Sequence, residues 1–158
     1  MSAQANTTAL PGSCPIRFFK CGIDLLGRFP MALLLLMSRI GVGAVFFKSG
    51  LVKIASWQAT VQLFTYEYQV PLLPPELAAR LGAIVELSAP VLLFLGLGAR
   101  FAAAAMLGMT FVIEVFVYPQ NWAEHLTWAA LLAFIITRGA GAISIDHLLA
   151  RRLLTKTR

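Results

Sequence analysis

The sequence predicts an all-α membrane protein, a bundle of four transmembrane helices with short amphipathic surface helices. Of the 158 residues, 59% are hydrophobic and only 13% are charged, whereas soluble domains average about 45–50% apolar and 25% charged residues. The mean hydropathy is +0.79. The apolar residues form successive segments between residues 30 and 136, most of them near the roughly 20 residues that a transmembrane helix needs.

Four segments are candidate spans: residues 30–50, 77–96, 101–117 and 122–136. The fourth is short, and we expect it to begin near Tyr118 or to continue towards Arg138. The first is not expected to be a cleaved signal peptide, because residues 1–29 precede it and no small-residue cleavage site follows it. The predicted domains are an N-terminal tail (1–29), a four-helix transmembrane domain (30–138) and a basic C-terminal tail (139–158).

The distribution of positive charge predicts the orientation. Nine of the thirteen basic residues lie in the two tails, in the turn that holds Arg100 or at Arg138, where the fourth span ends, and such an excess marks the cytoplasmic side. We therefore expect a multi-pass protein of the bacterial cytoplasmic (inner) membrane with both termini inside. The basic tails suit anionic lipid headgroups. No motif combines basic and aromatic residues for nucleic acid, so no nucleic-acid partner is predicted. The predicted partner is the lipid bilayer.

Short helices are expected outside the spans. Residues 15–28 suit an interfacial helix, and Cys14 and Cys21 beside it are expected to be free thiols in a reducing compartment. Trp57, Val61, Phe64 and Tyr68 recur at near-helical spacing in the long external connection, which predicts an amphipathic helix that ends at the prolines before the second span.

The C-terminal tail begins with a glycine-rich turn. Gly139 and Gly141 can adopt backbone conformations that are closed to other residues as the fourth helix ends. Ser144 or Asp146 is then placed to cap a helix over residues 146–154. Its leucines lie among basic residues, which favours a membrane-surface helix over a helix that docks on a partner protein.

Four ionisable side chains are expected at membrane depth: Arg39, Lys48, Glu86 and Glu114. Because a charge in the hydrocarbon costs about 2.5–3.5 kcal/mol on insertion scales, such residues usually face partners or a site. Arg39 and Glu86 each lie near the middle of their predicted spans, so we expect them to form a buried ion pair. That pair either fixes the helix register or forms a substrate or proton site.

Small residues indicate where helices approach one another. Gly43 and Gly50 share one helix face with Arg39 and Lys53, and small residues also surround Glu86 on its own face. Glu86 is therefore expected to point towards a neighbouring helix and not towards lipid.

A second polar group is predicted nearer the outer surface. Glu114 has Thr110 and Tyr118 at i−4 and i+4, and Lys48 is expected at a similar depth as its partner. His125, a residue type suited to proton transfer, lies close to Trp122 and Trp128 in the sequence. The predicted intramembrane polar site is Arg39, Lys48, Lys53, Glu86, Thr110, Glu114, Tyr118 and His125, with Glu86, Glu114 and His125 as the catalytic candidates.

Each of these residues also has a structural interpretation. Lys53 can extend to the lipid headgroups, and His125 can act as an interfacial hydrogen-bonding residue. No metal site is predicted, because His125 and His147 are expected on opposite sides of the membrane and the sequence contains no His-Cys cluster.

The order of several short motifs resembles the DoxX-like membrane proteins. The similarity begins with Arg39, the sequence FFKSGLVK at residues 46–53 and the Val70-Pro71 turn, and continues with ELSAP (86–90) and LLFLGLGAR (92–100). It ends with His125 and GAGAISID at 139–146, where Ala140 replaces the proline usual in that family. The residues of the family type are Arg39, Ser49, Gly50, Lys53, Glu86, Pro90, Arg100, Ser144 and Asp146.

The resemblance implies a four-helix inner-membrane protein linked to membrane redox or stress-response systems. The family takes its name from a subunit associated with thiosulfate:quinone oxidoreduction, and it supplies no agreed catalytic residue. The expectation is an accessory subunit of an oxidoreductase, not a self-sufficient enzyme, with a protein partner or a second copy and with quinone as the possible cofactor. A membrane scaffold with purely structural charges and a small transporter component are the alternatives.

Overall fold

The computed structural model describes Ile23, Gly27 and residues 29–156, and every regular element in this part of the chain is a helix. The segment 31–158 forms a compact unit. Cys14, Cys21 and most of the predicted interfacial helix at 15–28 lie outside the described residues.

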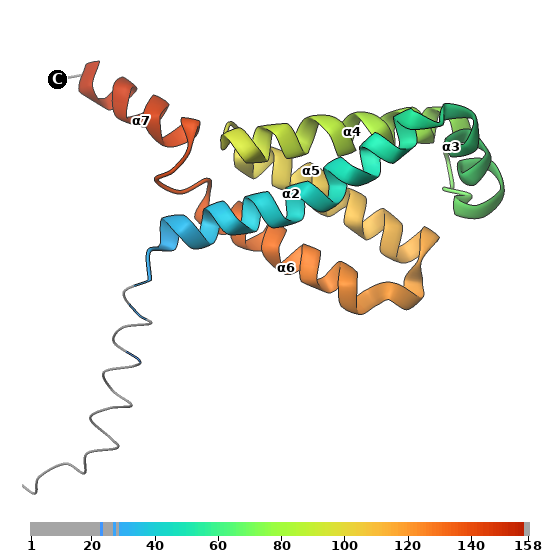
Figure 1. The fold of residues 1–158 in the computed structure, drawn as a ribbon, viewed down its shortest axis with the longest axis horizontal. Helices are drawn as coiled ribbons and strands as arrows, with labels where there is room; N and C mark the ends of the chain where they lie inside the picture. Colours follow the sequence, from blue (N-terminus) through green and yellow to red (C-terminus); the bar gives the residue numbers. More distant parts are fainter. Residues whose placement is uncertain (1–22, 24–26, 28, 157–158) are drawn as a thin grey trace, which may run out of the picture. The chain divides into compact units, whose positions relative to one another are not determined.

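Four helices form the bundle: α2 (Met31–Ala55), α4 (Pro75–Leu95), α5 (Ala99–Val112) and α6 (Trp122–Arg138). Each runs antiparallel to the next along the chain (Figure 1). Short elements complete the chain: α3 (Trp57–Leu63), the π-helices η1 (Phe64–Tyr68) and η2 (Ile113–Val117), the 3-10 helix η3 (Pro119–Asn121), and α7 (Ile145–Lys156). The all-α membrane bundle that the sequence predicts is confirmed.

Three segments of the described chain are long and apolar enough to cross a membrane: Met31–Ala55, Pro75–Leu95 and Ala99–Val117. The third consists of α5 and its continuation in η2. The first helix is longer than predicted, because it continues five residues beyond Gly50 to Ala55. The fourth helix of the bundle, α6, has 17 residues and extends to Arg138.

Small residues let the helices pack closely. The main core holds Val42, Phe46, Leu93, Met106, Leu132 and Ile135, with alanines between them. A side chain added at Gly50 would place its Cβ 2.9 Å from Leu87 Cδ2 and 3.0 Å from Glu86 Cβ. The predicted close approach of helices at Gly50 is therefore confirmed, and it brings α2 onto α4 beside Glu86.

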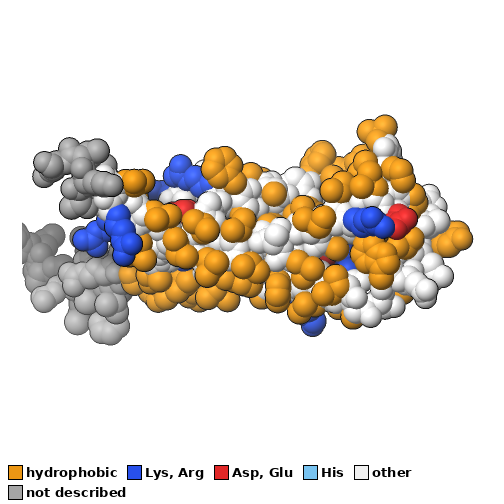
Figure 2. Space-filling view, turned by 90° about the horizontal axis from the view of Figure 1, so that it is seen from above, with side chains coloured by type: hydrophobic (Ala, Val, Ile, Leu, Met, Phe, Trp, Pro, Cys, Tyr) orange, Lys and Arg blue, Asp and Glu red, His pale blue; other side chains and the backbone are white. Residues whose placement is uncertain are grey.

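Large hydrophobic side chains cover much of the outside of the bundle. Val52, Phe101 and Phe111 are 66%, 85% and 66% exposed, and orange hydrophobic side chains cover much of the face shown in Figure 2. A soluble monomer rarely exposes such contiguous apolar surface. These side chains fit the hydrocarbon of a bilayer.

The two ends of the bundle are built differently. At one end, which we call the Arg39 end, Gly96 and Gly98 adopt left-handed conformations (φ 64° and 56°) in the tight turn between α4 and α5. Asp146 accepts hydrogen bonds from the backbone N–H groups of Gly98 and Ala99 at 2.8 and 3.2 Å. The start of the C-terminal segment therefore folds back onto the bundle.

The structure also shows which residue caps the last helix. The Ser144 hydroxyl accepts from the N–H of His147 at 3.2 Å and caps α7, whereas Asp146 caps α5. Gly139 and Gly141 have φ values of 79° and 80°, as predicted for the turn that ends α6.

At the opposite end, which we call the Tyr118 end, α3 and η1 provide the predicted helix in the connection between the first two spans. Pro74 is the N-cap of α4 and Pro75 occupies its first turn. Gln69 and Leu72 have positive φ values of 42° and 71° in the intervening turn. This connection lies against the end of η2, where Tyr68 and Tyr118 meet edge to face.

We expect Gly50→Ala to lower the free energy of unfolding by about 1–3 kcal/mol, because the added methyl group has no room between α2 and α4. Gly41→Ala in the same helix is the matched control, since a Cβ there meets no atom within 4 Å. Alanine at position 41 should be neutral or stabilising by up to about 1 kcal/mol. Denaturation in lipid bicelles measures both, and equal effects at the two positions would contradict the packing.

Candidate functional site

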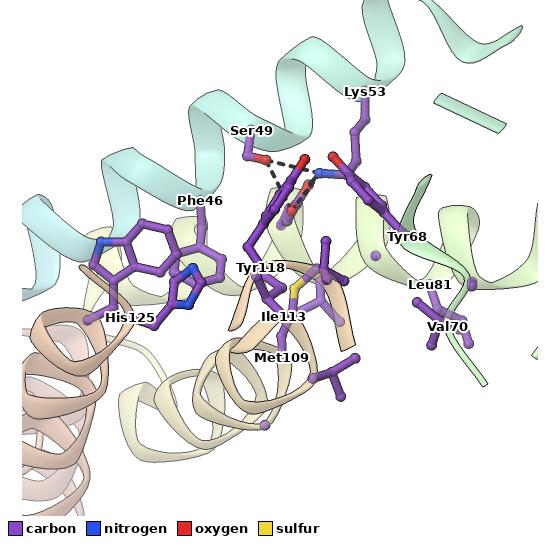
Figure 3. A pocket seen from close by; sticks show the side chains of 18 of the residues that line it. Phe46, Ser49, Lys53, Tyr68, Val70, Leu81, Met109, Ile113, Tyr118 and His125 are labelled. Atoms are coloured by element: carbon purple, nitrogen blue, oxygen red, sulfur yellow. Dashed lines mark hydrogen bonds and ion pairs between the residues drawn. The ribbon is translucent and has the colours of Figure 1, made fainter. Parts of the chain in front are cut away.

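A cavity of about 470 Å³ lies between the helices towards the Tyr118 end. Its wall is mostly apolar, with Val85, Met109, Ile113 and Trp128 among the lining residues, and the η1 connection contributes Tyr68 and Val70. The polar side chains on its wall are Ser49, Lys53, Glu86, Tyr118, Asn121, Glu124 and His125. Figure 3 shows ten labelled lining residues around this space.

The first polar cluster consists of Lys53, Glu86 and Ser49. Lys53 Nζ lies 2.7 Å from Glu86 Oε2 and donates to Oε1 at 2.8 Å. The Ser49 hydroxyl donates to Oε1 at 3.2 Å and accepts from Lys53 at 3.0 Å. Glu86 is 2% exposed and Lys53 14%, so this is a nearly buried ion pair with a shared hydroxyl.

The local sequence explains how this cluster forms. Ser49 and Lys53 are four residues apart and therefore lie on one face of α2, and Gly50 lets α4 approach that face. Pro90 has no N–H to donate to the carbonyl of Glu86 four residues earlier, yet α4 continues through it. The carboxylate of Glu86 thus meets α2 where Lys53 can neutralise its charge and Ser49 can donate a hydrogen bond to it.

The second polar cluster joins α6 to η2. His125 Nδ1 lies 2.5 Å from Glu114 Oε2, and the His125 ring packs against Trp128 with centroids 5.0 Å apart. Since a carboxylate accepts the Nδ1–H, Nε2 is the ring nitrogen left for a molecule in the cavity. Figure 3 shows His125 beside Phe46, away from Ser49 and Lys53, so His125 and the first cluster line different parts of one cavity.

A third contact closes the Tyr118 end. The Tyr118 hydroxyl donates to Glu67 Oε1 at 2.6 Å, and Tyr68 packs on both Tyr118 and Phe64. The hydrogen bond to Glu67 raises the pKa of Tyr118, because ionisation would place a phenolate beside a carboxylate. The η1 connection is thereby joined to η2 across the cavity.

The predicted pair between Arg39 and Glu86 is wrong. Arg39 is fully buried, but its guanidinium donates to the backbone carbonyls of Leu93 at 3.1 Å and Ile143 at 2.5 Å. Glu86 lies opposite Gly50, eleven residues further along α2, which is about 16 Å at 1.5 Å per residue. The close approach at Gly50 sets this register between α2 and α4, and the lengths of the predicted spans did not indicate it.

The predicted pairing of Lys48 with Glu114 is also wrong. Lys48 is exposed on α2, on a different face from Lys53, and Glu114 contacts His125 instead. The predicted stripe of Thr110, Glu114 and Tyr118 does not form, because η2 interrupts the α-helical register. The N–H of Tyr118 bonds to the carbonyl of Ile113, five residues earlier, at 2.9 Å.

The extra residue in this π-turn separates the three side chains. Tyr118 lines the cavity, Glu114 holds His125, and the buried Thr110 hydroxyl donates to the carbonyl of Met106. Single π-turns inside helices often occur at functional sites. The cavity therefore unites Lys53, Glu86, Tyr118 and His125 from the predicted set.

Several residues of the cavity were not in that set. Ser49 was named only through the family resemblance, although its position four residues before Lys53 was a usable signal. Tyr68 was expected on an outer surface helix, and Asn121 in η3 and Glu124 at the start of α6 had no signal. Glu67, which does not line the cavity but accepts from Tyr118, also had none. In the described part of the chain, no group of three or more His, Cys, Asp or Glu side chains is placed to hold a metal ion.

Comparison with models of protein families shows which family this chain belongs to. The model of the DoxX family matches residues 34–119 of this chain. The chain belongs to the DoxX family. The matched DoxX region holds Ser49, Lys53, Glu86, Glu114 and Tyr118, whereas His125 lies beyond it. Searches of curated proteins and of solved structures found no match.

Removal of the Lys53 charge should be more harmful than removal of both charges. We expect Lys53→Met to lower the free energy of unfolding by about 3–5 kcal/mol, because it leaves the buried carboxylate of Glu86 unpaired. The double variant Lys53→Met/Glu86→Gln should recover most of that loss, and bicelle denaturation of the two measures the difference. A double variant as unstable as Lys53→Met would contradict the pairing.

The contact between Tyr118 and Glu67 predicts a late tyrosine titration. Because the pKa of Tyr118 is raised, its stabilising effect is complete below the ordinary tyrosine pKa of about 10 and is lost as the pH rises through the raised value. Ultraviolet titration of the three tyrosines should show a late component that Tyr118→Phe removes and Glu67→Gln moves to lower pH. A late component that survives Tyr118→Phe would contradict the assignment.

Proposed function

We propose that this DoxX protein is an accessory membrane subunit that binds a quinone ring in the cavity and exchanges protons with it. The observation that carries the proposal is one apolar cavity lined at one place by Lys53, Glu86 and Ser49 and at another by His125, which Glu114 contacts through Nδ1. That the chain is a small membrane protein of the DoxX family does not depend on this proposal.

The cavity suits a lipophilic ring in size and lining. Sites for small molecules are typically about 300–1,000 Å³, mostly apolar, with a few polar groups that fix the orientation. The volume of about 470 Å³ and the aromatic side chains Phe46, Tyr68 and Trp128 fit that description. A quinone ring can pack against these side chains while its two carbonyl oxygens point towards polar groups.

The two clusters match the proton requirement of the reaction. Reduction of a quinone to a quinol takes up two electrons and two protons, one on each carbonyl oxygen. The Lys53 ammonium or the Ser49 hydroxyl can donate to one oxygen, and protonated His125 can donate through Nε2 to the other. Glu86 and Glu114 stabilise the cationic forms of their partners.

The electrons are assigned to a partner oxidoreductase that carries a flavin or metal redox centre. The resemblance to the DoxX-like proteins supports this assignment, since the family is named after a subunit associated with quinone reduction. In this proposal the protein lies in the bacterial inner membrane with both termini in the cytoplasm, as the distribution of basic residues predicts. The Tyr118 end then faces the outside.

Direct binding tests the proposal. We expect a short-chain ubiquinone or menaquinone analogue to quench tryptophan fluorescence of the purified protein in nanodiscs, because Trp128 lines the cavity. Gly108→Leu should raise the dissociation constant at least about tenfold, equivalent to 1.4 kcal/mol, because a side chain there enters open space at the cavity wall. Gly41→Leu, which faces open space elsewhere, is the matched control and should bind normally.

A second measurement separates the redox subunit from the scaffold and transporter alternatives. Glu86→Gln and His125→Gln should abolish quinone reduction in membranes that contain the native partner, while protein abundance and analogue binding persist. Full activity with both variants would favour a scaffold. An absence of saturable quenching by either analogue in the unmodified protein would reject the quinone site.

A further inference from the structure

A second hollow lies at the Arg39 end, remote from the cavity. It is a groove of about 530 Å³ whose lining includes Arg100 and Phe101 from the start of α5, Arg138 from the end of α6, Gly139, and His147 from α7. Three helices, α5, α6 and α7, therefore bring two arginines and a histidine around one space. The quinone proposal assigns no role to any of them.

The positive charge of this groove is offset only in part, by Asp146. Among the described residues, neither Arg100 nor Arg138 has an ion pair, although Asp146 also lines the groove. Both carboxylate oxygens of Asp146 accept backbone N–H groups, from Gly98 and from Ala99. Asp146 therefore already occupies the start of α5, and a bound anion would be held by the arginine side chains.

The side chain of Arg100 packs against the backbone at Gly139. A Cβ added at Gly139 would lie 3.4 Å from Arg100 Nε and 3.5 Å from Nη2, so the guanidinium packs directly against this glycine. Gly139 also has φ 79°, a conformation that glycine adopts without strain. The turn after α6 thus gives Arg100 a defined position at the edge of the groove.

The groove also has an apolar side. Phe101 is 85% exposed, and it opens the segment Ala99–Val117, which is long and apolar enough to cross a membrane. A ligand that meets both Arg100 and Phe101 needs an anionic group next to hydrocarbon. A membrane phospholipid has that chemistry, whereas a free phosphate has only the anionic part.

We propose that this groove binds the headgroup phosphate of an anionic membrane phospholipid. Arg100 and Arg138 contact the phosphate, for which the planar guanidinium is well suited, and Phe101 contacts the adjoining acyl chain. The site is independent of the cavity and of the proposed quinone function. It gives the basic residues at this end a specific ligand in addition to their general attraction to a charged surface.

Native mass spectrometry of the full chain with defined lipids tests the proposal. The probes are phosphatidylglycerol, which is anionic, and phosphatidylcholine, which is zwitterionic, with glycerol 3-phosphate as the soluble competitor. We expect the unmodified protein to retain phosphatidylglycerol about tenfold better than phosphatidylcholine. Arg100→Gln/Arg138→Gln should abolish this preference, and Phe101→Ser should weaken retention of the lipid.

The matched control is Lys48→Gln/Arg80→Gln, which removes two exposed cations from the other half of the bundle and should keep the preference. The conservative variant Arg100→Lys/Arg138→Lys retains both charges and should keep at least part of it, even if the glutamine variant fails to fold. Loss of the preference in the control as well, or equal retention of both lipids by the unmodified protein, would overturn the proposal. Displacement of the lipid by equimolar glycerol 3-phosphate would assign the groove to a soluble phosphate instead.

Discussion

The need to neutralise Glu86 inside an apolar bundle shapes the site of this DoxX protein. A lone carboxylate at this depth would be costly, and α2 supplies both Lys53 and Ser49 within hydrogen-bonding distance. Their contact requires the glycine at position 50, because the backbones of α2 and α4 approach closely there. The same interaction thus joins α2 to α4 and leaves a polar group on the cavity wall.

At the other end of the bundle, the buried guanidinium of Arg39 contacts backbone carbonyls instead of a carboxylate. The last carbonyls of a helix have no partner within the helix, and Arg39 donates to one of these, at Leu93, and to Ile143 in the C-terminal segment. Asp146 then joins that segment to the start of α5. The buried Arg39 and the capping Asp146 therefore join the C-terminal segment to the bundle at the Arg39 end. The cavity lies towards the Tyr118 end.

The two ends consequently suit different ligands. Near the Tyr118 end, the π-turn of η2 separates Tyr118 from Glu114, and the cavity has an apolar wall with the Lys53–Glu86–Ser49 cluster at one place and His125 at another. At the Arg39 end, the C-terminal turn holds unpaired arginines around an open groove. Within one small bundle, a lipophilic ring and a lipid headgroup can occupy separate places without competing.

The sequence by itself determined the membrane class, the four helices and the family, because hydropathy, proline and glycine positions and short motifs act over local distances. It also placed Glu86 against a helix, since the small residues around it share its face. The partners of the charges depended on tertiary structure. Arg39 donates to carbonyls and Lys53 pairs with Glu86 because the packing of α2 against α4 places Gly50, and not Arg39, opposite Glu86. Glu114 meets His125, and not Lys48, because a π-turn changes the register near residue 113, and no periodic pattern in the sequence marks such a turn.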